Sequence, residues 1–411
     1  MTFPTTKLKW VATTTAGGTP SVAEPSFWSD DGEEGLPWVS IGDMSGRAWV
    51  TTTGRRVSKA GVAAARLPVG DPGTLLLSMY ASLGHTAFLT TRATWNQAIL
   101  GINASPSHEV RFIKYALEAI KPTLMEFARS NTQANLNAEQ VGNLVLPEPP
   151  LDRQRRIADF LDAEVTRIDA LHRARTKQIS ALDERLEAVR DSLFCESPNS
   201  TSTPLMYLTD PFRPIVYGIV QAGPEFPGGV PYIKTGDLKN LHPESLSKTS
   251  PEIHNQFRRA AVHPGDIVMA MRASIGAVAI VPPELPESNL TQGTARIAAC
   301  DGVNNEWLFQ ALQTRRVREQ CDLRAVGSTF RTLNIWDLRR VTIIATSHHE
   351  QAKFVTQFRA VEAQHLSLRA AAQRQITLLA ERRQALITAA VTGQFDVSTA
   401  SGRNVTEGVA V

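Results

Sequence analysis

The sequence predicts an α+β protein in which two homologous mixed α/β domains are separated by two long helices that form an antiparallel coiled coil within the chain. Three observations predict this fold: an internal repeat, two long segments with a coiled-coil rhythm of apolar residues, and a change of composition at each boundary. The predicted parts are a first globular domain at 1–150, a helix at 151–196, a second globular domain at 197–346, a helix at 347–397 and a flexible tail at 398–411.

The internal repeat begins with "LPWVSIGDM" from Leu36 and "VPYIKTGDL" from Val230, which lie 194 positions apart. The further matches pair "TLLLSMYASLG" with "DIVMAMRASIG", "WNQA" with "LTQG", "NTQANLNAEQVGNLVL" with "STFRTLNIWDLRRVTI", and "TKQISALDERLEAV" with "QRQITLLAERRQAL". Their offsets stay between 192 and 197, as small loop insertions and deletions would produce. Five matches in one order predict a pseudo-twofold repeat, although each match alone is weak.

The globular domains are rich in Gly, Pro, Thr and short aliphatic runs such as "DIVMAM" and "GAVAIV". Such runs, bounded by turn residues, are typical of short strands. The segment "SHEVRFIKYALEAI" from Ser107 instead has helical periodicity. Each domain is therefore expected to be a mixed α/β fold.

The helical segments differ from these domains because 151–194 contains no Gly or Pro and its apolar residues alternate in steps of four and three. The other copy has nearly the same rhythm, which is the mark of a coiled-coil seam. The prolines of "LPEPPL" precede the first helix, and the Gly of "TGQF" is suited to end the second. The predicted seam residues are Ile168, Ile179, Leu182, Leu186, Val189 and Leu193 in the first helix, and Phe358, Val361, Leu368, Ile376, Leu379 and Leu386 in the second.

Composition bounds the class of protein. A chain of 411 residues can build two or three domains, and its three cysteines show no metal-type spacing, which suits a reducing compartment. The N-terminus has no signal-peptide core and no apolar run reaches the length of a membrane span, so we expect a cytoplasmic protein without a membrane partner.

Catalytic motifs are absent from the sequence: there is no phosphate loop, no dinucleotide-binding glycine motif and no nucleophile elbow. "HEQAK" at His349 to Lys353 lacks the second His of a zinc helix and is interpreted as a helix N-terminus. "DLK" at Asp237 to Lys239 has the spacing of a nuclease Asp-x-Lys, but the other copy has the Gly-Asp without the lysine, which favours a turn. We therefore predict a binding protein that is not an enzyme and has no metal site.

Charge is balanced in the first globular domain, with 12 Lys/Arg against 12 Asp/Glu, and nearly so in the second, with 15 against 13 over 205–346. Within the second, residues 313–340 hold seven arginines and three acids. Arg is a common phosphate contact and reads guanine edges, so this stretch is a candidate DNA-binding segment. A solvated helix face with salt bridges is the equal alternative.

The order of these segments resembles the DNA specificity subunit of type I restriction-modification systems. The resemblance spans about 1–397 and is carried by "PLDRQRRIADFLDAEVTRIDAL", the helix-start residues Gln154 and Gln351, and the closing "ERRQALITAAVTGQFDV". It implies two target-recognition domains that each read half of a split, asymmetric site in double-stranded DNA, and helices that set the gap and dock two methyltransferase subunits. It also implies a restriction/translocase subunit as a further partner, with no cofactor in this chain and S-adenosylmethionine, ATP and Mg in the partner subunits.

Polar residues at repeated strand or loop edges are the candidate DNA contacts. They are Tyr80, Ser82, Asn96, Gln97, Arg129 and Asn131 in the first domain, and Arg272, Ser274, Thr291, Gln292, Arg324, Ser328 and Arg331 in the second. A structural role is the alternative for each of them. The alternative for the whole chain is a coiled-coil scaffold whose globular domains bind proteins, and an enzyme with unrecognised motifs is a third possibility.

Overall fold

The structure, a computed structural model, describes residues 3–29, 35–80, 82–130, 136–195, 200–328 and 331–399, with only the backbone of 125–130. The described residues form two compact units: unit 1 contains the chain up to Thr176 and from Gln373 onwards, and unit 2 contains Lys177–Ala372. Each of the two long helices contributes one part to each unit. Asn131 and residues 400–411 of the predicted tail lie outside the described residues.

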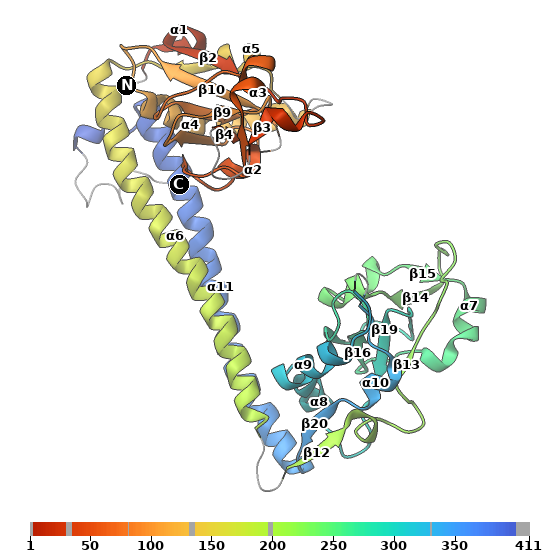
Figure 1. Cartoon of the computed structure of the whole chain (residues 1–411). Helices are drawn as coiled ribbons and strands as arrows, with labels where there is room; N and C mark the ends of the chain where they lie inside the picture. The colour runs from red at the N-terminus through yellow and green to blue at the C-terminus, as the bar shows by residue number, and fades with distance from the viewer. Residues whose placement is uncertain are drawn as a thin grey trace. The chain divides into compact units, whose positions relative to one another are not determined.

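The described part of unit 1 contains two larger sheets, a two-stranded sheet and parts of both long helices (Figure 1). The larger sheet has the order β2 (Ala12–Ala16), β10 (Ile99–Ala104), β7 (Leu75–Ser78), β8 (Thr86–Leu89) and β5 (Trp49–Val50). The smaller has the order β3 (Trp28–Ser29), β6 (Arg55–Val57), β4 (Leu36–Val39) and β9 (Thr94–Trp95), and β1 (Thr5–Lys7) pairs with β11 (Val145–Pro147). The helices of this unit's globular part are α1 (Leu8–Val11), α2 (Ile41–Met44), α3 (Lys59–Ala64), α4 (Val110–Ser130) and α5 (Ala138–Gly142).

Unit 2 repeats this plan. Its main sheet has the order β13 (Val216–Tyr217), β19 (Thr294–Ile297), β16 (Ile267–Ala270) and β17 (Val278–Ile280). A second sheet has the order β15 (Lys248–Thr249), β14 (Val230–Ile233) and β18 (Asn289–Leu290), and β12 (Thr201–Pro204) pairs with β20 (Thr342–Ala345). Its helices are α7 (Pro251–Gln256), α8 (Asn305–Leu312), α9 (Arg315–Arg324) and α10 (Ile335–Arg339), and two 3₁₀ turns used below are η2 (Leu205–Tyr207) and η3 (Thr235–Lys239).

The predicted fold class is confirmed, since two mixed α/β globular parts accompany two long helices, α6 (Leu151–Leu193) and α11 (His348–Thr392), that pack together (Figure 1). The helices are antiparallel. Asp169 near the middle of α6 pairs with Arg383 late in α11, whereas Asp183 late in α6 pairs with His365 earlier in α11. The prolines before α6 and Gly393 after α11, whose φ of +78° suits a C-cap, mark the expected helix boundaries.

The amphipathic helix faces also form the core of each unit. In unit 1, Ile157, Leu161 and Ile168 of α6 lie in one buried cluster with Phe112 of α4 and Leu386 of α11. In unit 2, Phe358 of α11 lies in a buried cluster with residues of α8 and α9 and the side chain of Leu186 packs against that cluster. The globular domains are therefore anchored on the helices by shared apolar cores rather than by loops alone.

Burial along the predicted seam is uneven. Ile168, Phe358 and Leu386 are at most 4 % exposed, while Leu193 and Leu368 are 36 % and 39 % exposed. The remaining seam residues are half-buried, namely Ile179, Leu182, Leu186, Val189, Val361, Ile376 and Leu379. Near Leu368 the buried residues of α11 are instead His365 and Ala372. Two helices alone bury only the side chains that face the partner helix. Apolar residues beside that contact therefore stay accessible where no globular domain covers them.

Candidate nucleic-acid interface

The two Gly-Asp segments form the same strand-turn element. β4 runs into α2 and β14 runs into η3, and each strand pairs in parallel with a two-residue strand, β9 or β18. The Asp43 carboxylate accepts hydrogen bonds from the Ser40 backbone N–H at 2.8 Å and the Ser40 hydroxyl at 2.7 Å. The Asp237 carboxylate accepts one from the Lys234 N–H at 2.8 Å. The turn interpretation is confirmed, and Asp237 of the Asp-x-Lys pattern closes this turn.

A second repeated element is the turn after the central strand. Gly84 and Gly276 have φ of +72° and +84°, and their N–H groups donate to Ser78 and Ala270. The left-handed conformation favours glycine at both positions, so the glycine shared by the two copies ends a real turn. The candidate residues Ser82, Arg272 and Ser274 of these turns are exposed, and Tyr80 is 37 % exposed.

The third repeated element is the loop at 95–97 and 290–292. The Asn96 N–H donates to Val39 and the Thr291 N–H donates to Ile233, which ties each loop to the Gly-Asp strand. Gly17 and Gly218 press on these loops so closely that a Cβ would lie 2.2 Å from the Asn96 carbonyl oxygen or 2.0 Å from that of Leu290. Glycine is therefore required at both positions for this approach.

The candidate residues on that loop differ in their freedom to contact a ligand. Asn96 accepts a hydrogen bond from the Ala98 N–H at 3.0 Å, and exposed Gln97 accepts one from the Thr19 hydroxyl. Thr291 and Gln292 are half-buried. Exposed Gln97 is thus the most accessible of the four, while Asn96 also shapes its own turn.

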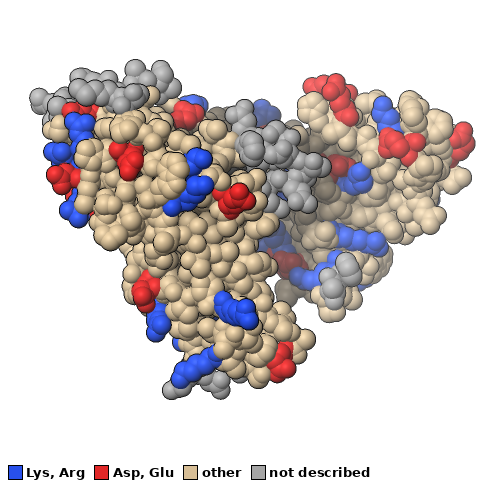
Figure 2. All heavy atoms as spheres, turned by 90° about the horizontal axis from the view of Figure 1, so that it is seen from above, with Lys and Arg blue, Asp and Glu red and all other residues tan. Residues whose placement is uncertain are grey.

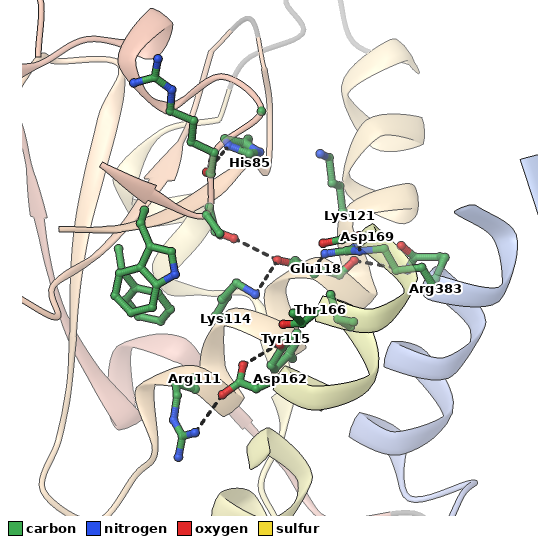
Figure 3. Close-up of a pocket in the computed structure, with 18 of the residues that line it drawn as sticks. His85, Arg111, Lys114, Tyr115, Glu118, Lys121, Asp162, Thr166, Asp169 and Arg383 are labelled. Atoms are coloured by element: carbon green, nitrogen blue, oxygen red, sulfur yellow. Dashed lines mark hydrogen bonds and ion pairs between the residues drawn. The ribbon is translucent and has the colours of Figure 1, made fainter. Parts of the chain in front are cut away.

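A cavity of about 950 Å³ in unit 1 lies where the segment after the Gly-Asp turn, the glycine turn, α4 and the two long helices meet (Figure 3). Arg47 and Trp49 come from the segment after α2, and His85 from the glycine turn. The His85 Nε2 donates to the Met44 carbonyl at 2.7 Å, which ties these two segments together. The further ionisable lining residues are Arg111, Lys114, Tyr115, Glu118, Lys121, Asp162, Asp169, His172, Arg173 and Arg383.

The acids of this cavity are already neutralised by neighbours. Glu118 pairs with Lys114 at 3.2 Å and with Arg383 at 3.0 Å, and Arg383 also bonds Asp169 at 3.2 Å (Figure 3). Asp162 accepts hydrogen bonds from Arg111 and Tyr115. Burial acts to raise the pKa of Glu118, but the adjacent Lys114 and Arg383 outweigh it and hold that pKa below its ordinary value.

Three other basic residues of this cavity are not paired with acids among the described residues. Within the described part of the chain, no ion pair joins Arg47, Lys121 or Arg173 to an acid. Arg47 and Arg173 are exposed and Lys121 is half-buried. The cavity consequently has net positive charge, although the positive and negative charges of the first globular domain as a whole are equal in number. Figure 2 shows basic and acidic side chains interspersed over one face of the molecule.

Unit 2 has a cavity of about 570 Å³ at the corresponding place. Its walls are again the Gly-Asp element (Thr235, Leu238 and Lys239), the glycine turn (Ser274 to Val278) and the helix that follows the sheet. Arg318 and Arg331 also line it. Arg331 pairs with Asp322 at 3.4 Å and Arg318 with Glu187 at 3.1 Å, whereas among described residues Lys239 has no ion pair. Each copy thus has a basic cavity beside the glycine turn and the helix that follows the sheet, bounded by the Gly-Asp turn in unit 2 and by the segment just after that turn in unit 1.

The arginine-rich stretch at 313–340 has features of both predicted alternatives, a DNA-binding segment and a helix face with salt bridges. Arg315 pairs with Glu319 at 2.8 Å, and Arg324 donates to the Gln320 carbonyl within its own helix. Arg340 lies 4.4 Å from the centroid of the Trp336 ring, which is 57 % exposed. Most of these arginines are engaged locally, and Arg318 and Arg331 reach the cavity.

The structure brings Ser274 and Arg331 together at the second cavity and leaves Ser328 exposed outside its lining. The side chain of Arg129, like all of Asn131, lies outside the described residues. Sequence reasoning missed Arg47, Lys121 and Arg173, and it considered Arg318 only as part of the arginine-rich stretch and Lys239 only as part of the Asp-x-Lys pattern. Aligning α4 with α8 and α9, as the five sequence matches did not, would have drawn attention to the basic positions of this helix.

Acid unfolding tests the Glu118 cluster. A carboxylate whose pKa is lower in the folded than in the unfolded state adds stability above its unfolded pKa, and that stability is lost as pH falls through the folded pKa. We therefore expect Glu118→Gln to destabilise unit 1 at pH 7 and to lose this effect at pH below the ordinary carboxylate range near 4.5. Urea unfolding of both proteins from pH 7 to pH 3 measures it. A pH-independent difference would contradict the cluster, and exposed Glu139 provides the control variant E139Q.

No metal-binding group of His, Cys, Asp and Glu occurs among the described residues, and none of the described helices is long and apolar enough to cross a membrane. These findings concern the described part of the chain alone.

The sequence model of the type I restriction modification DNA specificity domain matches residues 5–181 and 220–378. The specificity subunit of the type I restriction enzyme EcoBI of Escherichia coli is 25 % identical over 317 residues, covering 69 % of this chain and 65 % of that protein. The EcoR124I/EcoR124II specificity subunit of E. coli is 22 % identical over 43 % of this chain and 45 % of its own length. The chain thus spans less than two thirds of these curated relatives.

Solved structures show the same fold. A chain from a structure on complex assembly and conformational transition of a type I R-M system has a TM-score of 0.73 at 18 % identity, with 96 % of this chain and 98 % of that chain covered. The HsdS subunit from Thermoanaerobacter tengcongensis has a TM-score of 0.51 at 18 % identity, with 96 % and 97 % covered.

Proposed function

Because this chain belongs to the family of type I restriction-modification DNA specificity subunits, we propose that it binds double-stranded DNA and reads a bipartite, asymmetric site with a non-specific gap. Subunits of this family are non-catalytic and carry no cofactor. The observation that carries the proposal is the basic cavity that recurs in both copies beside the glycine turn and the helix that follows the sheet. Phosphate contacts hold a protein in register on a duplex, which is the role assigned to these cavities.

Divergence of the polar residues on the repeated turns and loops supports an asymmetric site. Tyr80 in the first copy corresponds to Arg272 in the second, and Asn96 corresponds to Thr291. Side chains with different donors and acceptors favour different base edges, so the two globular domains read different half-sites. Each specified base pair is worth about 1–3 kcal/mol of discrimination.

In this proposal the long helices α6 and α11 set the length of the gap between the half-sites and provide the surface on which partner subunits dock. A regular helix of 43 residues is about 65 Å long, enough to carry two recognition elements along a duplex. Two methyltransferase subunits dock on the helices, use S-adenosylmethionine to methylate adenine, and recruit the restriction/translocase subunit that uses ATP and Mg. The complex works in the cytoplasm, where its DNA substrate lies.

Genome methylation tests this function. Deleting the gene for this chain in its host, with the partner genes intact, is expected to abolish N6-methyladenine at one split, gapped sequence, because the methyltransferase then has no sequence reader. Single-molecule methylation sequencing measures this, and restoring the gene on a plasmid is the control. An unchanged methylation pattern would overturn the proposal in favour of a protein-binding scaffold.

A further inference from the structure

Two buried glutamines fix which residues of the two copies correspond. The Gln154 Oε1 accepts a hydrogen bond from the Glu109 N–H at 2.9 Å, and its Nε2 donates to the Pro149 carbonyl at 2.8 Å. The Gln351 Oε1 accepts from the Asn304 N–H at 2.8 Å, and its Nε2 donates to the Thr346 carbonyl at 2.9 Å. Counting from these anchors, Arg111 of α4 corresponds to Glu306 of α8, and Asp162 of α6 corresponds to Arg359 of α11.

In unit 1 the junction between globular domain and helix joins a cation on the domain to acids on the helix. The Arg111 Nη1 lies 2.8 Å from a carboxylate oxygen of Asp162 (Figure 3) and 2.8 Å from one of Asp159. Tyr115, only 2 % exposed, donates its hydroxyl proton to Asp162 at 2.7 Å. Burial and this hydrogen bond raise the pKa of the Tyr115 hydroxyl, so it stays a donor at neutral pH.

In unit 2 the charges of the corresponding junction are reversed. Glu306 on the domain forms a bidentate pair with Arg359 on the helix, and the Arg359 Nε lies 2.6 Å from the Glu306 Oε1. Gln310, which corresponds to Tyr115, accepts from the Arg190 Nε at 3.0 Å instead of donating to the helix start. The backbone frame is the same in both copies, while the sign of each partner is opposite.

We infer that these reversed pairs form a charge code that assigns each globular domain to its own helix start and makes the two domains non-interchangeable. The first domain placed on α11 would set Arg111 against Arg359 and remove the acceptor of the buried Tyr115 hydroxyl. The second domain placed on α6 would set Glu306 against Asp162. Like charges at contact distance and an unpaired buried hydroxyl both destabilise a folded junction. This inference does not depend on the DNA-binding proposal.

A domain graft tests the charge code, because the same substitution is expected to shift the melting temperature in opposite directions in the graft and in the native chain. In a full-length chain whose residues 202–344 are replaced by a second copy of 5–147, R359D is expected to raise the melting temperature by about 3 °C, because an acid again faces Arg111 and Tyr115. In the native chain the same R359D is expected to lower it by about 3 °C, because two acids then meet at Glu306. Thermal unfolding followed by circular dichroism measures both.

The native chain also provides a test that needs no graft. E306R and R359D are each expected to lower the melting temperature, whereas the double variant E306R/R359D restores at least half of the loss. The matched control is R369Q, which removes an α11 arginine that pairs with Asp183 away from the junction. The inference is overturned if R359D shifts the graft and the native chain in the same direction. If the graft does not fold, it is overturned if the double variant shows no restoration.

Discussion

Gln154→Leu and Gln351→Leu are each expected to lower the free energy of unfolding by about 3 kcal/mol. Each glutamine is at most 3 % exposed and joins the first turn of a long helix to the backbone of its globular domain. Leucine fills the space but leaves one buried N–H and one buried C=O without partners, and each costs about 1–3 kcal/mol. The apolar substitution is therefore expected to destabilise despite its higher hydrophobicity.

Urea unfolding followed by circular dichroism measures these losses. The double variant is expected to lose about the sum, because the two glutamines lie in different units and share no partner. Gln364 of α11 is exposed, so Q364L is the control and should change stability by less than about 0.5 kcal/mol. A Q154L protein as stable as this control would show that the hydrogen bonds of Gln154 do not contribute to the free energy of unfolding.

Replacement of Arg47, Lys121 and Arg173 by Gln is expected to weaken binding to duplex DNA about 100-fold or more at low salt. The physical reason is that each charge-assisted contact to phosphate contributes about 1.5–3 kcal/mol. Each lost contact also releases one counterion fewer, so the slope of log affinity against log salt concentration should become shallower by about 3. Because phosphate contacts carry no sequence information, specific and non-specific duplexes should be affected alike.

A salt titration of the complex between this chain and its methyltransferase measures this effect. The control is R66Q/R92Q, which removes cations of the same unit that do not line the cavity. Wild-type affinity that is insensitive to salt would contradict DNA binding altogether and favour the scaffold alternative. A wild-type slope retained in the triple variant would contradict only the assignment of the cavity.

The repeat determined more of the structure than composition or motifs did. The match of "SIGDM" with "KTGDL" predicted equivalent turns, and the structure has them with Asp43 and Asp237 in the same role. The match around Gly84 and Gly276 falls on a second pair of equivalent turns, in which both glycines have positive φ. These successes share a cause: turn closure, positive φ and helical periodicity depend on residues close in sequence.

The candidate contacts were harder to predict for the opposite reason. Whether Asn96 is free or holds its own turn, and whether Arg331 reaches a cavity or a neighbouring acid, depends on which side chains meet across the fold. Arg47, Lys121 and Arg173 are 74 and 52 positions apart along the chain, and no local pattern relates them. Their convergence on one cavity follows from the packing of α4, α6 and the Gly-Asp element.

The sequence by itself determined the duplicated plan, the Gly-Asp turn shared by both copies, and the two long amphipathic helices, because these follow from local periodicity and from comparing one half of the chain with the other. Only the tertiary structure decided which charges remain available and which are paired. A net-charge count does not show whether the charge of Glu118 or of Lys121 is paired. Packing places Glu118 against two cations and leaves Lys121 without an acid among the described residues. The reversed pairs Arg111–Asp162 and Glu306–Arg359 became visible for the same reason, since each joins residues about 50 positions apart that only the fold brings into contact.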